Sequence, residues 1–333
     1  MRIGIYGFGA IGKLLALTAI KRGHEVVGVL DVRSELIGKD VGSLLGMGEL
    51  GVKVSSDVDS LADADVVLHA TGSFLDKVYN QLVSVAEMGI HVVSTCETLA
   101  YPYYRYPVLA RELDMLARDY GSVIIGTGVN PGYIWDALVV TFGAALPSIK
   151  KITAIRSFDA AKRREAFRRK VGVGLSLEEF RKELSEGRLT AHVGYAESIF
   201  LISTAAGVQP SKILEHQEPV VAHERLESSG VIVERGLVAG VKGVGIGYLH
   251  DEEFVRLEFN AYVSAPEYDE ILVEGEDRII RWRCSGMHGD EATASIVLSV
   301  AENVRSLLPG LRLITELIPF KIRFTAKTTP FEA

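Results

Sequence analysis

"RIGIYGFGAIGKLLAL", residues 2–17, is the segment most informative about the fold of this chain. The apolar run at its start is followed by a glycine-rich turn and then by a helix-length stretch, Ala10–Arg22. In this arrangement Gly7 permits a tight turn, Gly9 lets the backbone approach a pyrophosphate, and Gly12 lets the helix pack close to the strand. The free N–H groups at the start of the helix would bind the pyrophosphate. The segment therefore predicts a dinucleotide-binding turn rather than a structural turn alone.

An acid follows at the position where such a turn needs one. Asp31 ends the second predicted strand, 19 residues beyond Gly12, and could accept hydrogen bonds from both hydroxyls of an adenine ribose. Its charge would repel a 2′-phosphate, so NAD is the expected cofactor. Arg33 is either a solvated loop charge or a partner for that phosphate, which leaves NADP open. The predicted cofactor contacts in this region are Gly7, Phe8, Gly9, Ala10, Ile11, Gly12, Asp31 and Arg33.

The first 134 residues alternate between short apolar runs and amphipathic stretches. The runs are apolar almost throughout, which is typical of strands in a parallel sheet covered on both faces. Ligands of such doubly wound α/β sheets bind at the carboxyl ends of the strands. The predicted strands are 2–7, 25–31, 64–71, 91–96 and 122–128, and the predicted helices are 10–22, 74–88 and 108–120. Further cofactor contacts are predicted where the chain leaves these strands, at Ala70, Thr71, Gly72, Cys96 and Asn130.

The second half has longer strands joined by tight Gly and Asp-Glu turns, which predicts hairpins in a mostly antiparallel sheet. The fold is therefore expected to be α/β, with an N-terminal Rossmann domain and a second, α+β domain for substrate binding and dimerisation. The active site is expected between the two domains. The predicted helices here are 133–146, 176–186, 195–207 and 290–308, and the predicted domains are 1–134 completed by 290–333, and 135–289.

The composition argues against several classes of protein. A formal net charge of −7 argues against non-specific binding to nucleic acid or to an anionic membrane. No apolar stretch is long enough for a membrane span, and no signal peptide is recognisable, so a cytoplasmic protein is expected. Two cysteines give no disulfide framework, and no group of residues has metal-ligand spacing. Only four Asn and three Gln are present, a depletion that is typical of thermophilic proteins.

"HVVSTCETLAYP", residues 91–102, places Glu97 where the chain leaves a hydrophobic strand. An ordinary loop carboxylate is one interpretation. The carboxyl end of a central strand is where ligands of this fold bind, and this position favours a catalytic role. Cys96 is expected to pack rather than to act as a nucleophile, because no partner His is assignable from the sequence.

The second half offers further polar and aromatic candidates, each with a structural alternative. Tyr133 and Trp135 either wall a pocket or belong to the core. His192 and His288 each precede a predicted helix, where capping or packing is the alternative role. The cationic run 160–174 is either a solvated face or a mobile loop over an anionic substrate or the cofactor phosphates. The predicted substrate contacts are Tyr133, Trp135, Arg163, Arg164, His192 and His288.

Five blocks behind "GFGAIG" resemble the 2,4-diaminopentanoate dehydrogenases: "STCETLAYP", "GTGVNPGYIWDAL", "RSFDAAKRREAFRRKVGVG", "HVGYAESI" and "MHGDEAT". The native amine dehydrogenases are similar to this family, and dihydrodipicolinate reductase is a distant relative. The resemblance runs over nearly the whole chain. It implies NAD(P)-dependent oxidative deamination of a primary amine to a ketone or aldehyde plus ammonia, or the reverse reaction. It also implies a homodimer formed mainly by the sheet domains.

The resemblance further implies that Glu97 is catalytic, because it stands at the first acid of the family's Cys-Glu-Glu-Leu loop. The second acid is Thr98 here, and the family's Thr-Arg-Arg-x-Pro-Phe-Gln block reads Lys-Arg-Arg-Glu-Ala-Phe-Arg at 162–168. These departures leave the substrate open. Two alternatives remain: an imine reductase of the dihydrodipicolinate type, whose paired His and Lys motif is not evident, and a non-catalytic NAD-binding sensor, which would have no use for Glu97.

Overall fold

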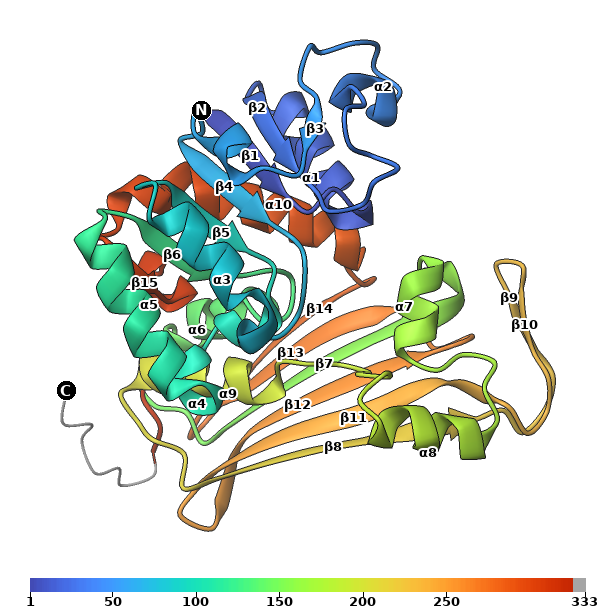
Figure 1. Cartoon of the computed structure of the whole chain (residues 1–333). Helices are drawn as coiled ribbons and strands as arrows, with labels where there is room; N and C mark the ends of the chain where they lie inside the picture. The colour runs from blue at the N-terminus through green and yellow to red at the C-terminus, as the bar shows by residue number, and fades with distance from the viewer. Residues whose placement is uncertain (326–333) are drawn as a thin grey trace. The chain divides into compact units, whose positions relative to one another are not determined.

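The computed structural model describes residues 1–325 and divides them into two compact units (Figure 1). Unit 1 consists of Met1–Tyr133 and His288–Pro319. Unit 2 consists of Ile134–Met287 and the described residues from Phe320 on. Each unit therefore contains segments that are distant in the sequence.

Unit 1 is built on a seven-stranded sheet in which every neighbouring pair of strands is parallel. Its strand order, β15-β6-β5-β4-β1-β2-β3, reverses direction beside β1, which is the switch point where doubly wound sheets bind ligands. The strands are β1 (Arg2–Tyr6), β2 (Glu25–Leu30), β3 (Val54–Ser55), β4 (Val66–His69), β5 (His91–Ser94), β6 (Val123–Gly126) and β15 (Gly310–Arg312).

Helices cover both faces of this sheet. Helix α1 contacts α10 on one face, and α3 contacts α5 on the other (Figure 1). The helices of unit 1 are α1 (Ala10–Lys21), α2 (Val41–Leu45), α3 (Leu75–Ala86), α4 (Pro102–Arg105), α5 (Pro107–Asp119) and α10 (Gly289–Asn303). Short 3-10 turns are η1 (Val58–Leu61), η2 (Glu97–Leu99), η4 (Val304–Ser306) and η5 (Ile314–Leu317). The predicted Rossmann architecture is confirmed, although β3, β15, α2 and α4 were not predicted because such short elements carry no periodic pattern.

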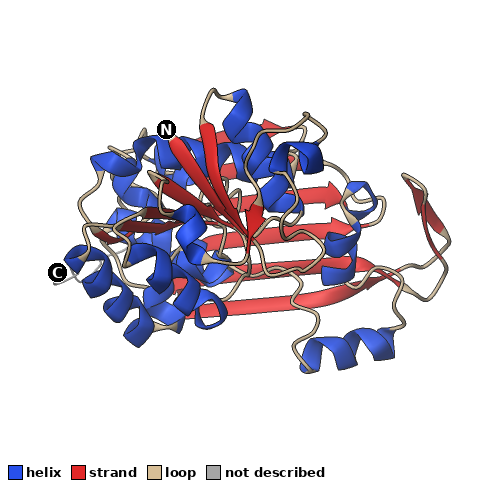
Figure 2. Ribbon diagram, turned by 45° about the horizontal axis from the view of Figure 1, so that its top comes forward, coloured by secondary structure: helices blue, strands red, loops and turns tan. Residues whose placement is uncertain are grey.

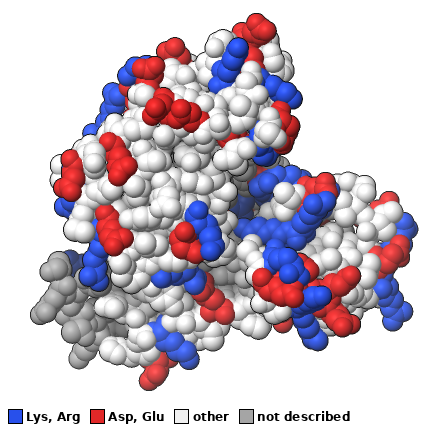
Figure 3. All heavy atoms as spheres, in the orientation of Figure 1, with Lys and Arg blue, Asp and Glu red and all other residues white. Residues whose placement is uncertain are grey.

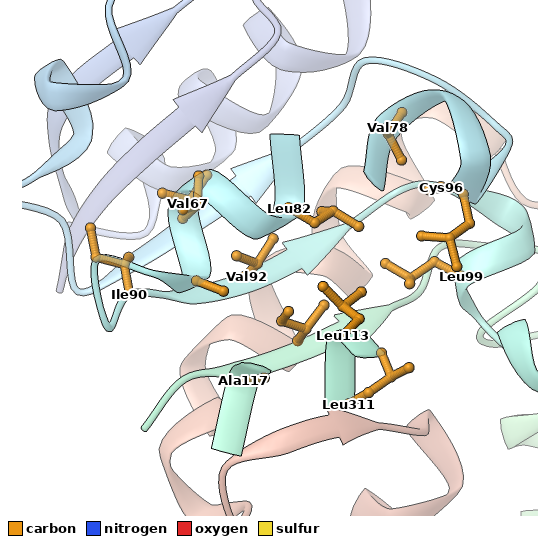
Figure 4. Packing of buried hydrophobic residues seen from close by; sticks show 14 of the residues in the cluster. Val67, Val78, Leu82, Ile90, Val92, Cys96, Leu99, Leu113, Ala117 and Leu311 are labelled. Atoms are coloured by element: carbon orange, nitrogen blue, oxygen red, sulfur yellow. The ribbon is translucent and has the colours of Figure 1, made fainter. Parts of the chain in front are cut away.

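The core under α3 and α5 shows why these residues form these elements (Figure 4). Val67 and Val92 point from neighbouring strands toward the helices. Val78 and Leu82, four residues apart on α3, lie on the same face of that helix and are buried against the sheet. Leu113 of α5 is buried in the same hydrophobic cluster.

Unit 2 contains a six-stranded sheet in the order β14-β13-β7-β12-β11-β8, whose long strands are drawn in red in Figure 2. All neighbouring pairs are antiparallel except β12 and β7, so the prediction of a mostly antiparallel sheet is confirmed. The strands are β7 (Lys151–Asp159), β8 (Lys212–Val221), β11 (Val238–Leu249), β12 (Glu252–Tyr262), β13 (Tyr268–Glu274) and β14 (Ile279–Cys284), and β9 (Leu226–Ser228) and β10 (Val231–Val233) form a separate ribbon.

Helix α9 lies unusually close to this sheet because β11 has glycine beneath it. A Cβ atom on Gly243 would lie 2.1 Å from the Oη of Tyr195, and one on Gly245 would lie 2.5 Å from the Cβ of Tyr195. The helical segments of unit 2 are α6 (Ala137–Gly143), η3 (Ala160–Lys162), α7 (Glu165–Lys170), α8 (Leu177–Ser185) and α9 (Tyr195–Ala206).

The structure corrects three expectations. The helix expected at 133–146 is shorter and begins at Ala137, because the Asp136 carboxylate accepts a hydrogen bond from the Ala137 amide (2.7 Å) and so starts the helix there. The run 160–174, expected as either a solvated face or a mobile loop, is not a continuous loop and contains η3 and α7. The last helix, expected at 290–308, ends at Asn303 and is followed by η4.

The C-terminal segment also differs from the expectation that 290–333 completes the Rossmann domain. From Phe320 on it belongs to unit 2. Phe324 is buried edge-on against Phe254, with ring centroids 4.9 Å apart, and Thr325 donates its amide to the Ile149 carbonyl (2.8 Å). A segment with two buried apolar side chains and no repeat gives no sequence signal for the unit to which it belongs. Residues 326–333 of the predicted segment lie outside the described residues.

Candidate functional site

The glycine turn of unit 1 has the geometry that a dinucleotide fingerprint requires. Gly7 has φ +91°, and a Cβ there would lie 2.7 Å from the Ala70 carbonyl oxygen. A Cβ on Gly12 would lie 1.8 Å from the Gly7 carbonyl oxygen, so only glycine fits where α1 meets β1. A Cβ on Gly9 would meet no atom of the described residues within 4 Å. Gly9 is also the N-cap of α1 and has no side chain to cap it, so the first N–H groups are left for a ligand.

Asp31 lies beside this turn and is tied to it. Its Oδ2 accepts a hydrogen bond from the Phe8 amide (2.6 Å). The Arg33 guanidinium binds both carboxylate oxygens, from Nε and Nη2, at 2.9 Å each. This contact with Arg33 holds the pKa of Asp31 down to about 2, so the carboxylate is charged at any working pH. The structure thus brings Asp31, Arg33 and the glycine turn together, with Arg33 already paired to Asp31.

A hydrogen-bond network that the sequence did not predict lies at the exit of β4. The buried ring of His69 contacts Ser94 Oγ through Nδ1 (2.8 Å), and Gln81 Oε1 and Thr71 Oγ1 through Nε2 (2.8 Å each). Burial lowers the pKa of His69 to about 4, so the ring is neutral at pH 7. Its Nδ1 then accepts from Ser94, and its Nε2 donates to Gln81. This network fixes the start of the turn Ala70–Gly72. The only sequence signal for it was a polar residue at the end of each of two apolar strands.

Glu97 is the first residue of η2, three positions beyond the end of β5 at Ser94, and its side chain is half-buried. Cys96 before it is fully buried, and burial, followed by the nearby charge of Glu97, raises the pKa of its thiol to about 12. The thiol therefore stays protonated and packs with Leu99 (Figure 4). Because β1, β4 and β5 are neighbours in the sheet, Gly7, Ala70–Gly72 and Glu97 all leave from the same carboxyl edge.

The remaining predicted residues of unit 1 lie in turns. Asn130 follows β6, next to Val129, whose amide bonds the Thr293 hydroxyl of α10 (3.3 Å). His288 is exposed at the N-cap position of α10, where its side chain makes no capping hydrogen bond. Tyr133 is half-buried at the end of the first segment of unit 1.

In unit 2, Trp135 and His192 belong to one aromatic cluster. The ring centroid of His192 lies 4.9 Å from that of Trp135 and 4.5 Å from that of Phe259, on which it stacks. Tyr195 stacks on Trp135 at 5.4 Å. Burial, with the charges of Lys170 and Arg156, lowers the pKa of His192 well below its usual value, so the ring is neutral. Sequence reasoning missed Tyr195 and Phe259, which lie in a helix and a strand with no distinguishing pattern.

The cationic run is partly folded onto aromatic rings and partly paired. Arg163 is half-buried, and its guanidinium lies 5.2 Å from the ring centroid of Phe158 and 4.8 Å from that of Phe167. Lys162 pairs with Glu267 (2.6 Å). Arg164, the N-cap of α7, is exposed. Lys and Arg side chains gather on the surface over η3 and α7 (Figure 3).

No helix in the described part of the chain has both the length and the apolar character needed to cross a membrane. Among residues 1–325, no three His, Cys, Asp or Glu side chains are grouped so that they could hold a metal ion.

Comparisons with known proteins agree with the two-part organisation. Residues 133–327 match the family model of the 2,4-diaminopentanoate dehydrogenase C-terminal domain, and residues 1–97 match that of the dihydrodipicolinate reductase N-terminus. The 2,4-diaminopentanoate dehydrogenase of Acetoanaerobium sticklandii is 29% identical over 329 residues, which cover 95% of this chain and 93% of that protein.

Two further comparisons concern one part of the chain and its overall fold. The 4-hydroxy-tetrahydrodipicolinate reductase of Archaeoglobus fulgidus is 30% identical over 149 residues, 42% of this chain and 56% of that protein. The solved structure of the amine dehydrogenase from Mycobacterium smegmatis superposes with a TM-score of 0.84, covering 97% of this chain and 98% of that one, at 23% identity. At this identity the superposition shows that the fold is shared.

Proposed function

The chain belongs to the 2,4-diaminopentanoate dehydrogenase family, and on that premise we propose that it is an NAD(P)-dependent oxidoreductase acting on the CH–NH2 group of a primary amine or diamino acid. One observation carries the proposal. Glu97, an acid at the carboxyl end of β5, leaves the same edge of the sheet as the glycine turn that would hold a nicotinamide dinucleotide.

The chemistry follows from the charge that develops on nitrogen. A bound nicotinamide cofactor supplies the acceptor for the hydride. As hydride leaves the amine carbon, that carbon and its nitrogen become an iminium cation, and a fixed carboxylate stabilises this charge where it forms. Glu97 would also take a proton from the ammonium form of the substrate and release it to solvent. It would then take a second proton from the water that adds to the iminium and return it to the departing nitrogen. No step needs a metal ion.

The test follows nicotinamide absorbance with NADH or NADPH and a panel of ketones and aldehydes, with and without ammonium. Oxidation of the cofactor only when ammonium is present supports an amine dehydrogenase. Turnover without ammonium would indicate a carbonyl reductase. Shifts of the melting temperature with NAD and no turnover on any substrate would favour a cofactor-binding sensor.

For the cofactor we propose NAD with some acceptance of NADP, because Arg33 neutralises the charge of Asp31 that would repel a 2′-phosphate.

Replacing Asp31 by Ser should lower kcat/KM with NADH about 10-fold, since a charge-assisted hydrogen bond to the ribose is lost. The same change frees Arg33 and should raise the NADPH-to-NADH ratio. Steady-state kinetics with both cofactors measure this. Glu35→Gln, an exposed charge in the same loop, is the control. An unchanged ratio in Asp31→Ser would contradict the assignment.

For the substrate we propose contacts from Tyr133, Arg163, Arg164, His192 and His288, with the arginines taking a carboxylate where the substrate has one. The fully buried Trp135 packs against His192 and is not itself a contact. Replacing Arg163 by Gln should raise KM for an amino-acid substrate about 10-fold, because a bidentate charge pair is lost, and should spare a simple amine. Arg169→Gln, which replaces an exposed arginine of α7 that pairs with Glu165, is the matched control. Equal losses on both kinds of substrate would exclude carboxylate binding by Arg163.

We also propose a homodimer formed through the six-stranded sheet. One face of that sheet carries the half-exposed apolar side chains of Ile155, Leu272 and Val244. Beside them Glu270 is buried under Arg281 and Arg283 (2.8 and 3.3 Å). Such a mixed face can meet a second copy of itself across a two-fold axis.

Sedimentation should give twice the chain mass for the wild type and a shift toward monomer for Ile155→Glu. A monomeric wild type would contradict the proposal of a homodimer.

The cytoplasmic location and the thermophilic source that the sequence suggests remain predictions.

A further inference from the structure

We propose that Thr98 is a positioning residue, which holds Glu97 against the turn Thr71–Leu75. The proposal rests on the function proposed above, since it assigns to Thr98 the placement of the acid at the centre of that function. It concerns the position at which the resemblance to the family implies a second acid.

The hydroxyl of Thr98 joins two loops that leave neighbouring strands. Thr98 is fully buried. Its Oγ1 accepts a hydrogen bond from the Leu75 amide (2.8 Å) and donates one to the Ser73 carbonyl (3.2 Å). Its own amide donates to the same carbonyl (3.1 Å). Three hydrogen bonds from one residue therefore fix η2 to the chain that follows β4.

The complete burial of Thr98 also excludes the interpretation that its side chain contacts the substrate. The substitution of the second family acid by Thr98 left the substrate open, because it could have changed the pocket. A side chain with no exposed surface and with both hydrogen-bonding functions used inside the protein does not reach a substrate. An ionised Glu could accept from Leu75 but could not donate to Ser73, so the hydroxyl serves a purpose that a carboxylate cannot.

Glu97 is held on both sides by this arrangement. On one side the Cys96 amide donates to Ser94 Oγ (3.1 Å), which in turn contacts His69 Nδ1. On the other side stands Thr98, anchored as described above. The backbone from which the Glu97 side chain leaves is therefore anchored through the residues on both sides of it. Movement of η2 would displace the carboxylate from the reacting nitrogen.

The same hydrogen bonds fix the other loop. Leu75 is the first residue of α3, and the N-cap Phe74 supplies no side-chain hydrogen bond, so the Thr98 hydroxyl takes the role of a cap from outside the helix. The turn Thr71–Leu75 includes Thr71 and Gly72, two of the predicted cofactor contacts. One hydroxyl thus sets the distance between the acid and a loop predicted to contact the cofactor.

The test compares Thr98→Val, which keeps the shape and removes the hydroxyl, with Thr98→Ser, which keeps the hydroxyl. Because a displacement of about 1 Å can cost about 100-fold in rate, Thr98→Val should lower kcat about 10- to 100-fold, with the affinity for NADH nearly unchanged. Thr98→Ser should stay within about threefold of wild type. Thr98→Ala is the second variant should Thr98→Val fail to fold.

Two comparisons separate positioning from general stability. Ser122→Ala removes another fully buried hydroxyl of unit 1, which donates to the Ile90 carbonyl (2.6 Å) at the opposite ends of the strands, and should lower the melting temperature without lowering kcat. In a Glu97→Gln background, Thr98→Val should cost less than about threefold, because two residues acting through one group are not additive.

The outcomes distinguish this proposal from the function on which it rests. A loss in Glu97→Gln with kcat unchanged in Thr98→Val would overturn the positioning role alone. Fully additive losses in the double variant would do the same, because Thr98 would then act independently of Glu97. Full activity in Glu97→Gln would overturn the proposed function itself.

Discussion

Replacing Glu97 by Gln is expected to lower kcat for ammonium-dependent reduction of a carbonyl about 1,000-fold, while the affinity for NADH stays unchanged. Gln has the same shape as Glu but no charge to stabilise an iminium, and its amide does not act as a proton acceptor at neutral pH. Removing one electrostatic stabiliser costs about 10²- to 10³-fold, and losing a general base costs about 10²- to 10⁴-fold. About 10³-fold is therefore a conservative value for a group with both roles, because it lies below the product of the two factors.

The measurement is initial-rate kinetics of wild type and Glu97→Gln with saturating NADH, with the cofactor affinity determined separately by fluorescence titration. Glu87→Gln, an exposed carboxylate at the end of α3, is the matched control and should keep wild-type kcat. Wild-type turnover in Glu97→Gln would contradict the catalytic role of this residue and the function built on it.

The second large effect concerns the stability of unit 2. Arg156 on β7 and Asp269 on β13 are both buried, with Nε and Oδ1 3.5 Å apart. Both also bind the backbone of Met287: Arg156 donates to its carbonyl (2.8 Å), and Asp269 accepts from its amide (2.7 Å). This pair therefore fixes the last residue of the long segment of unit 2.

Replacing Arg156 by Met should lower the free energy of unfolding by about 3–5 kcal/mol, because it leaves the Asp269 carboxylate buried without its counter-charge. Urea unfolding followed by tryptophan fluorescence measures this, since Trp135 and Trp282 both lie in unit 2. Arg256→Met, which removes a partly exposed pair with Glu253, should cost about 1 kcal/mol or less.

The double variant Arg156→Met/Asp269→Leu tests the cause. If the loss comes from an uncompensated buried charge, replacing both partners by apolar side chains should recover most of the stability. A double variant that is less stable than Arg156→Met would show instead that the hydrogen bonds to Met287 dominate.

The Rossmann unit could be predicted from the sequence because each of its signals is local. The spacing of Gly7, Gly9 and Gly12 reports a turn whose steric demands are set within a few residues. The apolar runs report strands buried on both faces, and the acid at the end of the second run falls beside the turn, as Asp31 does. The position of Glu97 at a strand exit could also be predicted, because the carboxyl ends of parallel strands share one edge.

Features that depend on residues far apart in the chain became evident only in the folded structure. Thr98 looked like a change near the substrate, but its hydroxyl binds Ser73 and Leu75, more than 20 residues earlier. Arg156 gave no sign of its buried partner Asp269, which is brought to it by the pairing of β7 and β13. Hydrogen bonds and ion pairs between distant segments leave no periodicity in the sequence. They are determined by the register of strands, which becomes defined only when the chain packs.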